Sequence, residues 1–102
     1  MDAKQMVTLV EKIKRKCYIT DNSKLINERL LDIIEDAILK VSELIGIEAN
    51  FDFSKAGTEC ELLKNYCFYI WNDKNIKEFE EAYLSDILKL RNKYLIKEEE
   101  NV

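Results

Sequence analysis

Residues 62–71 read LLKNYCFYIW, and only Lys64 and Asn65 in this stretch are plainly polar. A helix over these residues has no face for water, so other helices or another subunit must cover it. The β-propensity of the aromatic half favours a buried strand instead. A strand needs a partner, however, and the chain offers no second convincing strand. We therefore predict a helix at the centre of an all-α domain.

The start of this helix carries a capping signal. The sequence Thr58-Glu59-Cys60-Glu61 fits a capping box, in which the threonine oxygen accepts the amide of Glu61 and the glutamate reaches back. Upstream, the segment 46–57 between the two glycines is predicted to be a loop. The alternation of Phe51 and Phe53 is compatible with a short strand, but we expect a loop whose rings dock on the bundle.

Three further helices are predicted from apolar spacing. The first covers residues 3–17, and the second follows the polar segment 20–23 and ends at Gly46. The last begins after a cap at Asn75 and carries one apolar stripe: Ile76, Phe79, Tyr83, Ile87, Leu90 and Tyr94. The expected fold is a compact bundle of about four helices with a loop between the second and third. Residues 1–96 form this single domain, and residues 97–102 form an acidic, disordered tail.

Length and composition exclude several classes of protein. A chain of 102 residues supports one hydrophobic core. A net charge of −4 disfavours a general nucleic-acid coat, and we interpret the basic cluster 12–16 as a helix end rather than a nucleic-acid contact. Three cysteines without a secretory leader indicate the cytosol. No apolar stretch is long enough to cross a bilayer.

The residues needed for catalysis are scarce. The chain has no histidine, which removes the usual general base and every Ser-His-Asp or Cys-His arrangement. The cysteines lack the CxxC spacing of zinc sites. Glu28, Asp32 and Glu35 share a helix face, but a solvated face is favoured over a metal site. We therefore predict no catalytic, cofactor-binding or metal-ligating residues and no enzymatic activity.

The aromatic helix suggests a contact with another protein. Tyr66 and Tyr69 lie on one face of it, and Phe68 and Trp71 on another. A small monomer has difficulty covering both directions, and tyrosine and tryptophan often anchor contacts between chains. We predict a partner interface that the helix or the neighbouring loop contributes, with these residues: Phe51, Phe53, Tyr66, Tyr69 and Trp71.

Several runs together resemble a known family. They are residues 33–37, 50–54, 62–72 and 79–91, with Gly57 between them. From about Ile19 to Ile96 the chain resembles the small head-tail connector proteins of tailed bacteriophages and prophages. The chain departs from the family pattern at Ala56, where relatives often have proline, and at Asn72-Asp73, where they often have two asparagines.

This resemblance implies a structural adaptor without cofactors. It would be a monomer when free and a homo-oligomeric ring on assembly, and it would dock under the portal protein and extend the DNA channel toward the tail. The implied partners are the portal and a tail-proximal completion protein, without a membrane or sequence-specific nucleic acid. The implied location is the virion head-tail junction, after the bacterial host cytoplasm. The alternative is a cytosolic helical regulator or dimerisation module that uses residues 76–94 as an antiparallel or coiled-coil seam.

Overall fold

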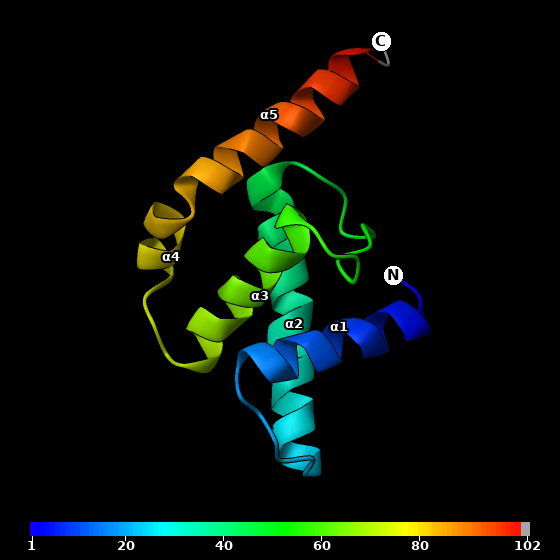
Figure 1. Ribbon diagram of the computed structural model, residues 1–102, viewed down its shortest axis with the longest axis vertical. Coiled ribbons are helices and arrows are strands. Elements are labelled where there is room, and N and C mark those ends of the chain that lie inside the picture. The colour runs from blue at the N-terminus through cyan, green and yellow to red at the C-terminus, as the bar shows by residue number, and fades with distance from the viewer. Residues whose placement is uncertain (101–102) are drawn as a thin grey trace.

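Helix α3 (Thr58–Trp71) lies alongside α2 (Lys24–Ile45) (Figure 1). The computed structural model describes the backbone of residues 1–100 and the side chains of residues 1–96. Helix α3 contacts α1 (Ala3–Lys16), α2, α4 (Ile76–Ala82) and α5 (Leu84–Glu100). The apolar sequence of α3 is therefore covered by its own chain on several sides, as the hydrophobic effect requires.

Residues 1–100 are all-α, which confirms the predicted fold class. Figure 1 shows α2 as the long central column, with α1 crossing it and α3 alongside. Helix α4 lies beside α3, and α5 runs obliquely away from the body at one end. The predicted loop between α2 and α3 contains turns and no strand within the described part of the chain. Among residues 1–100, no helix combines the length and apolarity that a bilayer crossing requires.

The hydrophobic core draws on every helix and on the loop. Its members are Leu9, Ile13 and Cys17 of α1 and its C-cap, Leu30, Ile34, Ala37, Ile38, Val41 and Ile45 of α2, Leu62, Leu63, Tyr66 and Cys67 of α3, Phe79 of α4, Ile87 and Leu90 of α5, and Phe53 of the loop. The described chain measures 48 × 31 × 19 Å.

Local side-chain hydrogen bonds set most of the helix boundaries. Ser23 caps α2 by accepting from the amide of Ile26, and Asn75 caps α4 by accepting from the amide of Lys77. Gly46 ends α2 in the left-handed region, with φ of 76° and ψ of 40°. These three predicted boundaries are confirmed.

The capping box predicted at Thr58 is wrong. Gly57 is the N-cap of α3 and provides no side-chain hydrogen bond, so Thr58 is already helical. The carboxylate of Glu61 lies 2.6 Å from the ammonium group of Lys64 rather than at the N-cap amide. A capping signal one residue out of register with the helix start cannot form its two reciprocal bonds.

The predicted last helix divides into α4 and α5 at Tyr83. This residue has φ of −109° and ψ of 16°, and its ring packs 5.0 Å from that of Phe79. The break lets α4 contact α3 while α5 turns to contact α2 (Figure 1). A single straight helix over residues 76–100 could not pack along both α3 and α2. The apolar spacing continues through the break, which is why periodicity alone predicts a single helix.

The predicted disordered tail begins at residue 97, whereas the backbone of α5 continues to Glu100. Residues 101–102 and the side chains of residues 97–100 lie outside the described part of the structure.

Candidate functional site

The structure separates the five predicted interface rings into three places. Phe51 and Phe53 belong to the loop between α2 and α3, where their ring centroids are 5.0 Å apart in an edge-to-face arrangement. Phe53 is fully buried in the core, whereas Phe51 is half-buried and also packs 6.3 Å from the ring of Tyr94 in α5. The loop is thus attached to the bundle by its rings, as expected, and Phe53 has no exposed surface for a partner in this conformation.

Tyr66 and Tyr69 belong to the contact between α3 and α4. Their ring centroids lie 5.2 and 5.6 Å from that of Phe79, both in edge-to-face geometry. Tyr66 is buried, and burial raises the pKa of its phenol. Tyr69 is half-buried and also packs 6.4 Å from Tyr83. The pair stabilises the α3–α4 junction, and only Tyr69 keeps appreciable exposed area.

Trp71 lies at the end of α3, apart from the other rings. The guanidinium carbon of Arg29 in α2 is 4.4 Å from the centroid of the Trp71 ring, a cation–π contact that covers one ring face. Trp71 is half-buried. Phe51, Tyr69 and Trp71 therefore keep exposed edges on three separate parts of the surface, and their role in a partner interface stays a prediction.

A second apolar surface escaped the sequence reasoning. Leu84, Leu88 and Leu95 are 50%, 51% and 55% exposed, and their spacing of four and seven places them on one face of α5. We call these three residues the α5 leucine stripe. It lies next to the buried face that carries Ile87 and Leu90. The leucine spacing is present in the sequence, but the same helix also carries a longer apolar stripe, and the prediction used only that one.

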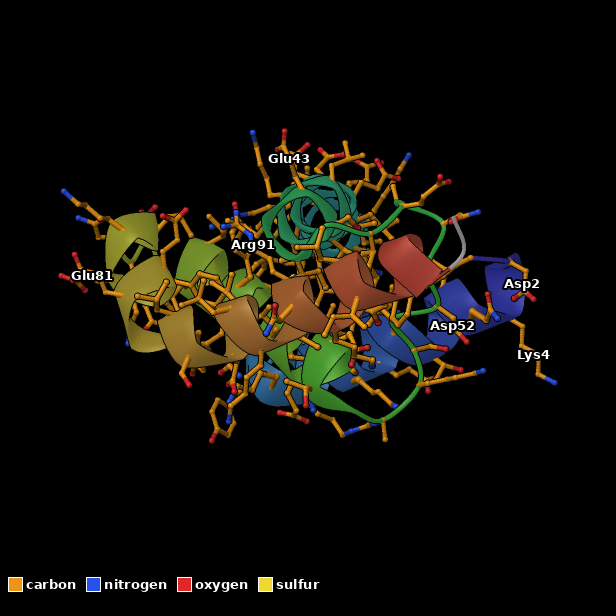
Figure 2. All side chains as sticks on the ribbon, turned by 90° about the horizontal axis from the view of Figure 1, so that it is seen from above. Asp2, Lys4, Glu43, Asp52, Glu81 and Arg91 are labelled. Atoms are coloured by element: carbon orange, nitrogen blue, oxygen red, sulfur yellow. The ribbon has the colours of Figure 1, made fainter. Side chains whose placement is uncertain are left out.

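Arg91 borders the α5 leucine stripe. Figure 2 labels this side chain between α5 and α2, where its Nε donates to the carbonyl oxygen of Leu44 at 2.5 Å. This contact holds the stripe beside the end of α2. Between Arg91, Leu95, Ile45 and Gly46 lies a cavity of about 300 Å³. The stripe is therefore supported by the body of the protein rather than carried on an isolated helix.

A basic cleft lies on another side of the molecule, between α1 and α3. It has a volume of about 480 Å³, and Lys12, Arg15 and Lys16 of α1 face Lys64 of α3 across it. The ammonium group of Lys12 donates to the carbonyl oxygen of Ser54, which joins the wall of the cleft to the loop. The predicted basic cluster thus lines a cleft in addition to ending a helix.

The side chains described for residues 1–96 form no group of metal-ligating residues. Glu28, Asp32 and Glu35 are all exposed. The three thiols are free and buried. Burial raises the pKa of Cys17 to about 11 and that of Cys67 still further. A protonated thiol is a poor nucleophile, so these cysteines serve packing.

Comparison of the chain with protein-family models, with curated proteins and with solved structures finds no match.

Proposed function

We propose that this chain is a structural adaptor of the phage head-tail connector type, which works by contact rather than by catalysis. The proposal rests on the sequence resemblance across most of the chain and on one structural observation, the α5 leucine stripe. Leucine side chains half-exposed on one helix face are typical of helices that bind in a groove of another protein.

The geometry supports a terminal docking element. Helix α5 leaves the body obliquely at one end of the molecule (Figure 1), and its inner face is anchored by Ile87 and Leu90. The outer stripe can therefore be buried by a partner without unfolding the core. We assign the α5 leucine stripe to contact with the portal. The half-exposed rings of Phe51, Tyr69 and Trp71 then remain for neighbouring copies in the ring or for the tail-proximal completion protein.

The experiment combines the chain with a portal protein of a tailed phage or prophage and images the mixture by electron microscopy. Wild-type chain is expected to add a ring of density beneath the portal. Leu88→Glu is expected to abolish this density, because a carboxylate in an apolar groove loses its hydration. Lys89→Glu is the control, since Lys89 is exposed on the same helix and lies about 100° around its axis from Leu88.

Circular dichroism of Leu88→Glu should match wild type, because the replaced side chain is already half-exposed. The connector proposal is contradicted when wild type leaves the portal unchanged, or when Leu88→Glu binds the portal as well as Lys89→Glu does.

A dimerisation module is the second candidate, and the spacing of α5 favours it. Leu84, Leu88, Arg91 and Leu95 follow the four-three-four repeat of a coiled-coil seam, with an arginine at one position. Such a module would dimerise in isolation, whereas the connector assembles on its docking site. Sedimentation that finds a dimer abolished by Leu88→Glu, together with specific DNA retardation at physiological salt, would establish the module and exclude the adaptor.

A further inference from the structure

The basic cleft between α1 and α3 concentrates positive charge on an acidic protein. Among the described side chains that line it, four are cationic and only Glu61 is anionic, although the whole chain has a net charge of −4. Glu61 is already paired with Lys64 at 2.6 Å. Lys12, Arg15 and Lys16 therefore remain as uncompensated charge around one hollow, where the local potential attracts anions.

Stabilisation of the helix end explains only part of this arrangement. Arg15 and Lys16 lie in the last turn of α1, where cations interact favourably with the helix dipole. Lys64 lies in the middle of α3, away from the helix ends, so the helix dipole does not explain why it faces α1. Lys12 is held at the cleft by Ser54 and keeps two further ammonium protons for a ligand. The cations thus converge from two helices that are far apart in sequence.

Arg15 has the chemistry of a phosphate ligand. Its side chain is exposed, and no carboxylate or carbonyl oxygen pairs with it among residues 1–96, whose side chains the structure describes. A guanidinium group presents planar, paired donors that match two oxygens of a phosphate. Arg15 is therefore available to bind an anion without breaking an existing contact.

Two aromatic rings complete the cleft. Phe68 is half-buried in its wall, with the ammonium groups of Lys16 and Lys74 lying 5.7 and 5.1 Å from its ring centroid. Tyr18 lies at the rim of the cleft and is 86% exposed. Its backbone φ is 57°, a value that residues other than glycine rarely adopt. An exposed phenol ring beside cations is a stacking surface for a planar group.

We propose that the α1–α3 cleft binds a nucleotide, with the phosphate on Arg15, Lys16 and Lys12 and the base against Tyr18. The volume of the cleft lies within the usual range for small-molecule sites, about 300–1,000 Å³. The shared chemistry of a free nucleotide and of a nucleic-acid strand is the phosphate joined to a planar base. We assign the free mononucleotide, because the acidic surface of the remaining chain repels a long polyanion.

The test is titration calorimetry at low salt with four probes: adenosine monophosphate, adenosine, inorganic phosphate and a short oligoadenylate. Adenosine monophosphate is expected to bind one site, more tightly than adenosine or phosphate alone. Arg15→Gln is expected to weaken its binding by about tenfold or more, the worth of a charged hydrogen bond. Lys4→Gln is the matched control, because Lys4 is exposed in the first turn of α1 (Figure 2), whereas Arg15 lies in the last turn of the same helix.

The rings are tested separately. Tyr18→Gly is expected to weaken binding of adenosine monophosphate and to leave binding of inorganic phosphate unchanged. The contrary outcome is that oligoadenylate binds more tightly than the mononucleotide and that Arg15→Gln abolishes this binding. This result would show that the cleft binds a nucleic-acid strand and would overturn the assignment to a free nucleotide. Absence of binding by every probe, equal binding of phosphate and adenosine monophosphate, or binding that is insensitive to Arg15→Gln overturns the proposal.

Discussion

The phenol of Tyr94 donates a hydrogen bond to Oε2 of Glu59, which joins the middle of α5 to the first turn of α3. Lys93 adds a second donor to the same oxygen at 3.1 Å. Glu59 is 34 residues from Lys93 and 35 from Tyr94 in the sequence, so these contacts fix tertiary structure. This carboxylate therefore helps to hold the middle of α5 against the start of α3.

Replacement of Glu59 by glutamine tests this contact. The amide keeps the shape of the side chain but loses the charge, and hydrogen bonds to a charged group contribute about 1.5–3 kcal/mol. We expect Glu59→Gln to lower the free energy of unfolding by roughly 1–2 kcal/mol, measured by urea unfolding. Glu48→Gln, at an exposed loop position, should change it little. Equal effects of the two substitutions would contradict the assignment.

The same carboxylate predicts acid sensitivity. Burial opposes ionisation of Glu59, but the hydrogen bonds from Tyr94, from its backbone amide and from Lys93 outweigh it and hold its pKa below the ordinary value of 4.5. The unfolded chain therefore takes up this proton first as the pH falls. The stabilisation is complete above pH 4.5 and is lost as the pH falls through the lowered pKa. Urea unfolding across this range should show a smaller loss for Glu59→Gln than for wild type; a parallel pH dependence would rule the contribution out.

The aromatic junction between α3 and α4 predicts a graded loss of stability. Phe79 is fully buried against Tyr66, Tyr69 and Tyr83, so Phe79→Ala should cost about 3–5 kcal/mol. This loss approaches the total stability of a small domain, which could leave Phe79→Ala unfolded. Phe79→Leu creates a smaller cavity and provides a variant that stays folded. Phe51→Ala should lower the free energy of unfolding by less than Phe79→Ala does, because Phe51 is only half-buried. Thermal or urea unfolding measures the order, and a larger loss at Phe51 would refute it.

The end of α1 predicts a stabilising substitution. Tyr18 occupies the left-handed position of a Schellman motif, in which Ile19 donates to the carbonyl of Lys14 and Tyr18 to that of Arg15. Glycine adopts this conformation without the cost of about 1–2 kcal/mol that a side chain incurs. Tyr18→Gly should therefore raise the free energy of unfolding by up to about 1 kcal/mol, after the entropy of the more flexible unfolded chain is subtracted.

Asp73 provides the matched control for Tyr18. It has a φ of 55° at the corresponding position after α3, where Lys74 donates to the carbonyl of Tyr69. Aspartate tolerates this region better than tyrosine, so Asp73→Gly should gain less. A larger gain at Asp73, or a loss at Tyr18, would show that the backbone at Tyr18 is not strained.

The burial of the thiols predicts slow chemical modification. Cys67 is fully buried and Cys17 nearly so, and burial raises the pKa of both. A thiol reagent at pH 8 should therefore label both slowly in the native protein and rapidly in urea. Mass spectrometry should find Cys67 labelled last. Fast native labelling of Cys67 would contradict the packing of α3 against its neighbours.

Local sequence signals account for the helices and most of their ends. Ser23, Gly46 and Asn75 act through hydrogen bonds to residues within four positions, so their effect can be read from the chain. The capping box predicted at Thr58 does not form, because the N-cap is Gly57, one residue earlier than predicted. The two reciprocal bonds of the box require Thr58 itself to be the N-cap. Leu30 and Leu31 are adjacent in the sequence, and tertiary packing buries Leu30 completely while Leu31 stays 39% exposed.

The candidate surfaces were less predictable than the helices. The five predicted rings are real packing residues, but they pack in three places because each meets a different neighbour. The α5 leucine stripe emerges only when the structure shows that the adjacent face, with Ile87 and Leu90, is the buried one. The basic cleft likewise requires Lys64 to meet α1, a pairing about fifty residues apart that no local pattern contains.

The sequence by itself determined an all-α chain, its central aromatic helix and the loop before it, because apolar periodicity and caps act over one or two turns. The tertiary structure decided the break at Tyr83, the choice of buried leucines, and which surfaces of α1, α3 and α5 remain open. Periodicity fixes the direction of a side chain about its own helix axis. The angle between two axes, and hence what each face meets, depends on contacts between residues far apart in the chain.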